Sequence, residues 1–183
     1  MMKLRTVGVL IAIAVWMASA GGAQQHTHTP AAAGAGTAQA AHHAFLEQER
    51  AAIKRGEGFG MALPADRSGY PGPKHILELK EDLKLTVEQQ AAVEKLLAVM
   101  KEKAIARGKE VLLGEERLEK MFAAGRPEAE LREESFRVAS LRAELRWVHL
   151  EAHLAARKLL TPEQLSTYHH LRWGNTGHTH SGE

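Results

Sequence analysis

Apolar side chains recur every three or four residues from residue 87 to residue 159, which is the spacing of one face of a helix. A first run spans residues 87–123, and its apolar stripe consists of Val93, Leu97, Met100, Ala104, Val111, Leu118 and Phe122. A second run spans residues 127–159 with the alternating spacing of a coiled coil, through Leu131, Ser135, Val138, Leu141, Leu145, Val148, Ala152, Ala155 and Leu159. Gly125 and Pro127 mark a tight turn between the runs. The pattern predicts two long antiparallel helices.

Shorter patterns flank this hairpin. A helix is expected over residues 40–55, another from about residue 74, and a last one from residue 162 to residue 173. Residues 56–73 hold five Gly and three Pro and should form a loop. Its large side chains predict packing against the hairpin, or alternatively a mobile apolar contact for other proteins: Phe59, Met61, Leu63 and Tyr70. Gly108 and Gly114 are expected to bend the first long helix. The predicted fold class is all-α, a long antiparallel helical hairpin with short flanking helices.

A repeated motif marks the start of two of these helices. It reads LTVEQ at residues 85–89 and LTPEQ at residues 160–164. Thr86 and Thr161 can each accept a hydrogen bond from the backbone N–H three residues later, while Gln89 and Gln164 reach back to the N–H of the cap residue. Two capping boxes therefore predict helix starts at residues 87 and 162.

One hairpin covers only its two facing stripes. Several apolar side chains lie outside them: Leu96, Val99, Leu112, Leu113, Met121 and Phe136. A second copy of the chain, related by a two-fold axis, is the simplest way to cover them. The sequence therefore predicts a homodimer.

The amino terminus has the features of a signal peptide. Lys3 and Arg5 precede an apolar run over residues 7–16, and small residues follow at 18–23. Residues 1–23 are expected to be removed on export, with an uncleaved signal anchor as the alternative; after cleavage no stable membrane insertion is expected. Residues 24–39 are rich in Ala and Gly and predict a disordered tract, residues 40–173 form the helical domain, and residues 174–183 form a flexible tail.

Charge and composition exclude several classes of function. Removing residues 1–23 takes away two of the 24 Lys and Arg and none of the 22 Asp and Glu, which leaves 22 of each. Without a basic excess, the chain is not expected to bind nucleic acid. The chain has no Cys, which excludes disulfides, a lipid-modified cysteine and a thiol nucleophile. No phosphate-binding loop, zinc-protease signature or nucleophile elbow occurs. We therefore expect no enzymatic activity and no required cofactor.

Histidine is the residue type most suited to chemistry here. His149 and His153 are four residues apart on one helix face, where two imidazoles can share a zinc, copper or nickel ion. A third ligand would have to come from another element, and the candidates are His75, His42, His43, Glu47, His169 and His170. The alternative interpretation is that both histidines are packing residues beside the hairpin seam.

Two further histidine pairs lie near the chain ends. His26 with His28, and His178 with His180, are paired side chains on polar segments that can bind such ions weakly. The alternative is that they belong to solvated polar tails without a metal.

The export signal, the hairpin and the two motifs at residues 85–89 and 160–164 resemble the Spy/CpxP family of periplasmic proteins, which includes a zinc-associated, ZraP-like branch. The resemblance covers residues 70–173. It implies a periplasmic, cradle-shaped, all-helical dimer that binds unfolding envelope proteins without ATP under envelope or metal stress. It identifies no client-contacting residue on this chain. The histidine-bearing ends are more similar to the metal-linked branch, which keeps a periplasmic metal-binding regulator as the alternative function. A purely structural envelope coiled coil is a third interpretation.

Overall fold

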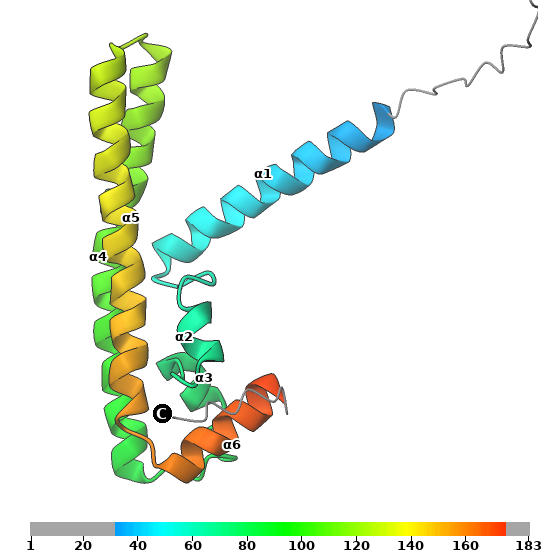
Figure 1. Ribbon diagram of the computed structural model, residues 1–183, viewed down its shortest axis with the longest axis vertical. Helices are drawn as coiled ribbons and strands as arrows, with labels where there is room; N and C mark the ends of the chain where they lie inside the picture. The colour runs from blue at the N-terminus through cyan, green and yellow to red at the C-terminus, as the bar shows by residue number, and fades with distance from the viewer. Residues whose placement is uncertain (1–31, 175–183) are drawn as a thin grey trace, which may run out of the picture.

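The structure, a computed structural model, describes residues 32–174. Its helices are α1 (Ala32–Lys54), α2 (Leu63–Arg67), α3 (Pro73–Glu78), α4 (Val87–Ala123), α5 (Glu128–Arg157) and α6 (Pro162–Trp173). α4 and α5 run antiparallel along their whole length (Figure 1), and the described residues contain no strand. The all-α prediction with a long hairpin is confirmed.

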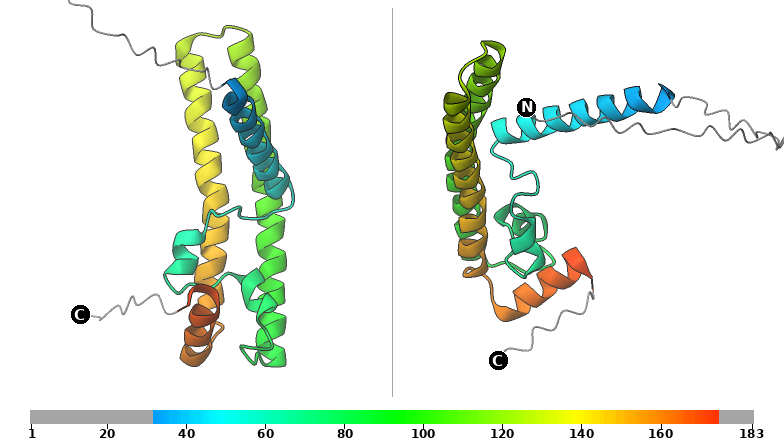
Figure 2. Two further views of the ribbon diagram at one scale, coloured as in Figure 1. Left: turned by 90° about the vertical axis from the view of Figure 1, so that its right-hand side faces the viewer. Right: turned by 45° about the horizontal axis from the view of Figure 1, so that its top comes forward.

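The shorter helices all lie on one side of the hairpin, which we call its inner side. α1 leaves α4 near the middle of the hairpin, and α6 leaves at the end opposite the turn (Figures 1 and 2). Residues 55–72, which we call the strap, connect α1 to α3 and include α2. A single chain therefore has a concave inner side bounded by α1 and α6.

Two apolar clusters hold this arrangement together. One lies at the open end of the hairpin and joins α3 and α6 to α4 and α5, through Ile76, Leu83, Val93, Ala156, Leu160 and Tyr168. The other lies where α1 crosses the hairpin and consists of Ile53, Ala104, Val111 and Leu145. The inner elements are thus attached at two separate places along the hairpin.

Gly108 and Gly114 do not interrupt α4, which continues through both. A Cβ atom at Gly108 would lie 2.6 Å from Ile53 Cγ2, and one at Gly114 would lie 2.9 Å from Val138 Cγ2. Side chains of α1 and α5 therefore reach the backbone of α4 at these two positions. The glycines serve close packing.

Several boundaries differ from the sequence prediction. α1 begins at Ala32, so residues 32–39, assigned above to a disordered tract, are helical. Alanine has the highest helix propensity and needs no large side chain to form a helix. α2 lies inside the predicted loop, where Pro64 stands in its first turn. Residues 24–31 of that tract, the signal peptide and residues 175–183 lie outside the described residues. Within the described part of the chain, no helix has both the length and the hydropathy that a bilayer span requires.

The buried faces of the hairpin also differ from the predicted stripes. Phe122 is 63% exposed, because it lies at the last turn of α4 beside the tip of the hairpin. On α5, Ser135 is exposed, whereas His149, His153 and Ala156 are buried. The strap and α3 cover this end of α5 as a second layer, so more of its circumference is buried than two facing stripes would require.

Candidate functional site

Both predicted capping boxes are present. Thr86 Oγ1 accepts a hydrogen bond from the backbone N–H of Gln89 at 3.1 Å, and Gln89 Oε1 accepts one from the N–H of Thr86 at 3.1 Å. In the second motif, Thr161 and Gln164 make the same two bonds at 3.3 and 2.9 Å. These residues set the first turns of α4 and α6.

The two motifs are also bonded to each other. Gln89 Nε2 donates to Gln164 Oε1 at 2.8 Å, and Gln164 Nε2 donates to Gln89 Oε1 at 2.9 Å. Each amide also donates to a backbone carbonyl from the other half, Gln89 to Leu159 at 2.9 Å and Gln164 to Leu83 at 3.1 Å. The pair fastens the open end of the hairpin, an architectural role that the capping signal alone does not predict.

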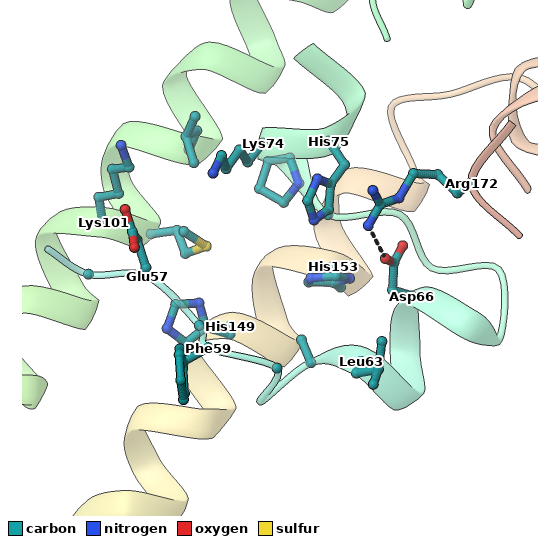
Figure 3. A pocket seen from close by; sticks show the side chains of 18 residues that line it. Glu57, Phe59, Leu63, Asp66, Lys74, His75, Lys101, His149, His153 and Arg172 are labelled. Carbon is teal, nitrogen blue, oxygen red and sulfur yellow. Dashed lines mark hydrogen bonds and ion pairs between the residues drawn. The ribbon is translucent and has the colours of Figure 1, made fainter. Parts of the chain in front are cut away.

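His149 and His153 lie on α5 and line one cavity of about 290 Å³ on the inner side (Figure 3). Their neighbours around it include Met100 and Lys101 of α4 and His75 of α3. Both histidines are almost fully buried. The sequence therefore placed these two side chains together correctly, and the strap is what encloses them.

Strap glycines lie directly over the two rings. A Cβ atom at Gly58 would lie 3.2 Å from His149 Nδ1, and one at Gly72 would lie 2.9 Å from His153 Nε2. His153 Nδ1 is 2.7 Å from the carbonyl oxygen of Tyr70, so a neutral His153 holds its proton on Nδ1 and donates it there. His149 Nε2 is buried without a hydrogen-bond partner.

Burial governs the protonation of this pair. Desolvation lowers the pKa of His149, and the neighbouring His153 lowers it further. Desolvation also lowers the pKa of His153, against a smaller opposing effect of the Tyr70 carbonyl. Both rings are therefore held neutral more firmly than exposed imidazoles.

A metal site is not completed by the described residues, among which no group of three or more His, Asp or Glu side chains could hold an ion. His75 lines the same cavity but bonds Glu78 through Nδ1 at 2.8 Å. The other proposed third ligands lie away from the cavity: His42, His43 and Glu47 on the exposed part of α1, and His169 and His170 on α6. The terminal pairs, His26 with His28 and His178 with His180, lie outside the described residues.

An acidic residue of the strap locks it to α6. Asp66 is buried and accepts a hydrogen bond from the Tyr168 hydroxyl at 2.6 Å. It also forms an ion pair with Arg172 at 3.2 Å. Burial, reinforced by the Asp66 carboxylate, raises the pKa of Tyr168 well above its ordinary value, so the hydroxyl keeps its proton and donates. The strap is thus held to α6 through a buried polar contact at α2.

Large apolar side chains remain exposed beside the cavity. Phe45 of α1 and Phe59 of the strap lie 5.3 Å apart between ring centroids, and Phe59 lines the cavity together with Leu63. These three residues, which we call the inner apolar face, come from α1 and from two places in the strap, which only the fold brings together. No sequence motif marks them, although Phe59 and Leu63 are among the large loop side chains for which the sequence predicts either packing against the hairpin or a mobile apolar contact.

Neither the family models, nor the curated proteins, nor the solved structures contain a match to this chain.

Proposed function

We propose that the protein is an ATP-independent chaperone of the Spy/CpxP type that binds unfolding proteins of the bacterial envelope. The observation that supports it is the inner apolar face, where Phe45, Phe59 and Leu63 are 54%, 40% and 39% exposed. Apolar side chains grouped on a concave surface are typical of sites that bind other proteins. The proposed export of the chain places such clients in the periplasm.

The charges around this face suit weak, exchangeable binding. Lys74 and Lys101 line the same cavity as Phe59, as does Glu57, which is paired with Arg55 at 2.8 Å. A bound client segment would contact separate apolar side chains surrounded by charged groups of both signs. Such a mixed surface would hold many sequences loosely, because its apolar and charged contacts do not depend on one particular side chain.

The test is suppression of aggregation of an unfolding protein at stoichiometric ratio, without nucleotide. We expect Phe45→Ser with Phe59→Ser to raise the amount of protein needed for half-maximal suppression several-fold. Val87→Ser is the matched control, because Val87 is 81% exposed at the start of α4, away from the inner apolar face. Suppression that is absent in the native protein, or equally reduced by the control, would contradict the proposal.

Metal binding stays a separate prediction. Its support is the pair His149 and His153 in one cavity, to which the described residues add no complete set of ligands. We therefore place a zinc, copper or nickel regulator second.

A further inference from the structure

The cavity on the inner side has the size that small organic ligands occupy. Its volume of about 290 Å³ is close to the lower end of the about 300–1,000 Å³ typical of small-molecule sites. Four of the larger side chains that line it are apolar, Phe59 and Leu63 of the strap and Leu97 and Met100 of α4. Met100 is buried, whereas Phe59 and Leu63 stay exposed. The lining therefore suits a ligand with a compact apolar body.

The charged side chains of the lining leave one positive charge in excess. Three of them are basic and two are acidic: Lys74, Lys101, Arg172, Glu57 and Asp66. Asp66 and Arg172 form an ion pair with each other, so their charges cancel. The excess therefore lies at the other side of the cavity, with the two lysines.

Glu57 does not neutralise both lysines. Its pKa is lowered chiefly by the hydrogen bond from Arg55, and Lys74 and Lys101 lower it further. The carboxylate of Glu78 lies 3.8 Å from Lys74 and is the second acidic group of this cluster. Three cations thus surround two carboxylates. A ligand with a single negative charge balances this side of the cavity.

One polar atom of the lining has no partner inside the protein. His149 is 3% exposed, and its Nε2 atom is buried without a hydrogen bond to any of the described residues. Figure 3 shows the nitrogen-bearing edge of this ring turned toward the side of the cavity where Glu57 and Lys101 lie. A buried polar atom without a partner is costly. An oxygen atom of a ligand in the cavity would supply that partner.

We infer that the cavity binds a small organic monocarboxylate. Its carboxylate accepts a hydrogen bond from the Nε2–H of a neutral His149 and is attracted by Lys101. Its apolar body packs against Phe59 and Met100. His153 takes no part as a donor through Nδ1, because that atom is bonded to the Tyr70 carbonyl. A dianion such as phosphate would exceed the single positive charge and would leave the apolar lining uncovered.

The first test compares two probes of the same size by calorimetry at pH 7.5, with a chelator present so that no metal ion bridges probe and histidine. Octanoate carries a carboxylate, and octanamide is its neutral isostere. We expect octanoate to bind the purified protein about ten-fold more tightly, because a hydrogen bond to a charged acceptor is stronger than one to a neutral acceptor. Absence of octanoate binding, or equal binding of both probes, would overturn the inference.

The second test assigns the binding to the cavity. His149→Phe keeps an aromatic ring and should remove most of the selectivity for octanoate over octanamide, while Lys101→Gln should weaken octanoate binding by up to about five-fold. Lys95→Gln is the control for charge, because Lys95 is exposed on α4 and does not line the cavity. Phe45→Ser is the control for the exposed apolar surface outside the cavity. Equal weakening by either control and by Lys101→Gln would refute the site.

The third test uses the native chain and requires no substitution. In nitrogen NMR spectra, saturating octanoate should shift the Nε2 resonance of His149. The resonances of His170, which is exposed on α6 and does not line the cavity, should stay in place. A His149 resonance that does not move at saturation would overturn the inference. The inference does not rest on the proposed function, because all three measurements are made without a client.

Discussion

At the scale of single residues, Gln89 and Gln164 connect two helix starts through one pair of amides. Each side chain caps its own helix, bonds the other glutamine and bonds a carbonyl of the other half of the chain. Removing either side chain takes a partner from two backbone groups and from the other glutamine. Such groups are costly where water does not replace the lost bond.

We expect Gln89→Ala to lower the free energy of unfolding by about 1–3 kcal/mol, measured by urea denaturation, because the Thr86 N–H, the Leu159 carbonyl and the Gln164 amide lose a partner. Gln90→Ala is the control. The Gln90 side chain donates to Glu94 at 2.7 Å on the surface, and its loss should change stability by no more than about 0.5 kcal/mol. Gln164→Ala combined with Gln89→Ala should be less damaging than the sum of the two, and strict additivity would show that the amides are not coupled.

The buried histidines predict a stability that falls in acid. Their pKa values are lowered in the folded state, so the unfolded state binds protons more readily below its own imidazole pKa of about 6.5. The free energy of unfolding should therefore be constant above about pH 6.5 and decrease as the pH falls below it.

His149→Leu tests this dependence. His149 Nε2 has no partner, so the substitution removes a titrating group without removing a hydrogen bond from that atom. We expect the difference in stability between pH 7.5 and pH 5 to shrink, as measured by urea denaturation at both values. Leu145→Ala is the control: it should cost about 2–5 kcal/mol at both pH values, since it removes core volume and no titrating group. An unchanged pH difference in His149→Leu would contradict the assignment.

At the scale of helices, the sequence predicted most accurately where local signals and burial agree. α4 spans Val87–Ala123, as expected, because a capping box begins it and Gly125 follows its end with a φ of 61°. α2 was missed, because five residues opening with Leu63 and Pro64 in a Gly-rich segment have no periodicity to detect. The start of α1 was missed because its alanines favour a helix but the segment has no periodic pattern of large apolar side chains.

The candidate site was predictable only in part, for a related reason. The spacing of His149 and His153 placed them on one face of α5, but their deep burial depends on Gly58 and Gly72, which lie more than 80 residues away in sequence. Likewise, Phe45 and Phe59 meet only because α1 crosses α4 at Gly108. Contacts between distant segments leave no mark on local patterns.

Gly108→Ala tests the crossing of α1 over α4. Alanine favours a helix over glycine by about 1 kcal/mol, but a Cβ there would lie 2.6 Å from Ile53 Cγ2 and 3.0 Å from the Ile53 carbonyl oxygen. We expect the contact to dominate, with lower stability and faster hydrogen exchange in α1. Adding Ile53→Ala should recover part of the change caused by Gly108→Ala. Exchange in α1 that stays at the native rate would show that the crossing adapts.

Tyr168→Phe tests the lock between the strap and α6. The substitution keeps the ring but leaves the buried Asp66 carboxylate with Arg172 as its remaining partner, so we expect a loss of about 1–3 kcal/mol in urea denaturation. Tyr70→Phe is the control, because Tyr70 interacts through its backbone and through the ring under Arg157. Equal effects of both substitutions would assign the loss to the ring environment.

At the scale of the whole molecule, the shorter elements all lie on the inner side of the hairpin (Figures 1 and 2). This side presents the cavity and the inner apolar face, where we propose that clients bind.

The predicted metal binding is best measured on the whole chain, because its candidate histidines lie in the cavity and near both ends. Since no three-ligand group occurs among the described residues, we expect calorimetry with zinc, copper and nickel to detect weak binding by the terminal histidines. Binding should persist in His149→Ala with His153→Ala and disappear when residues 24–31 and 175–183 are deleted. Loss of binding in the double histidine variant would instead establish the cavity as the site.

The reciprocal amides have a consequence for the order in which the chain matures. A polypeptide emerges from its amino end, so Gln89 is present well before Gln164, 75 positions later. Until that residue arrives, the first glutamine can complete its own helix start but has no counterpart at the foot of the hairpin. A chain truncated before α6 should therefore retain the packing of α4 against α5 around Val111 and Leu145, but its open end would lack the bonds that the second glutamine supplies.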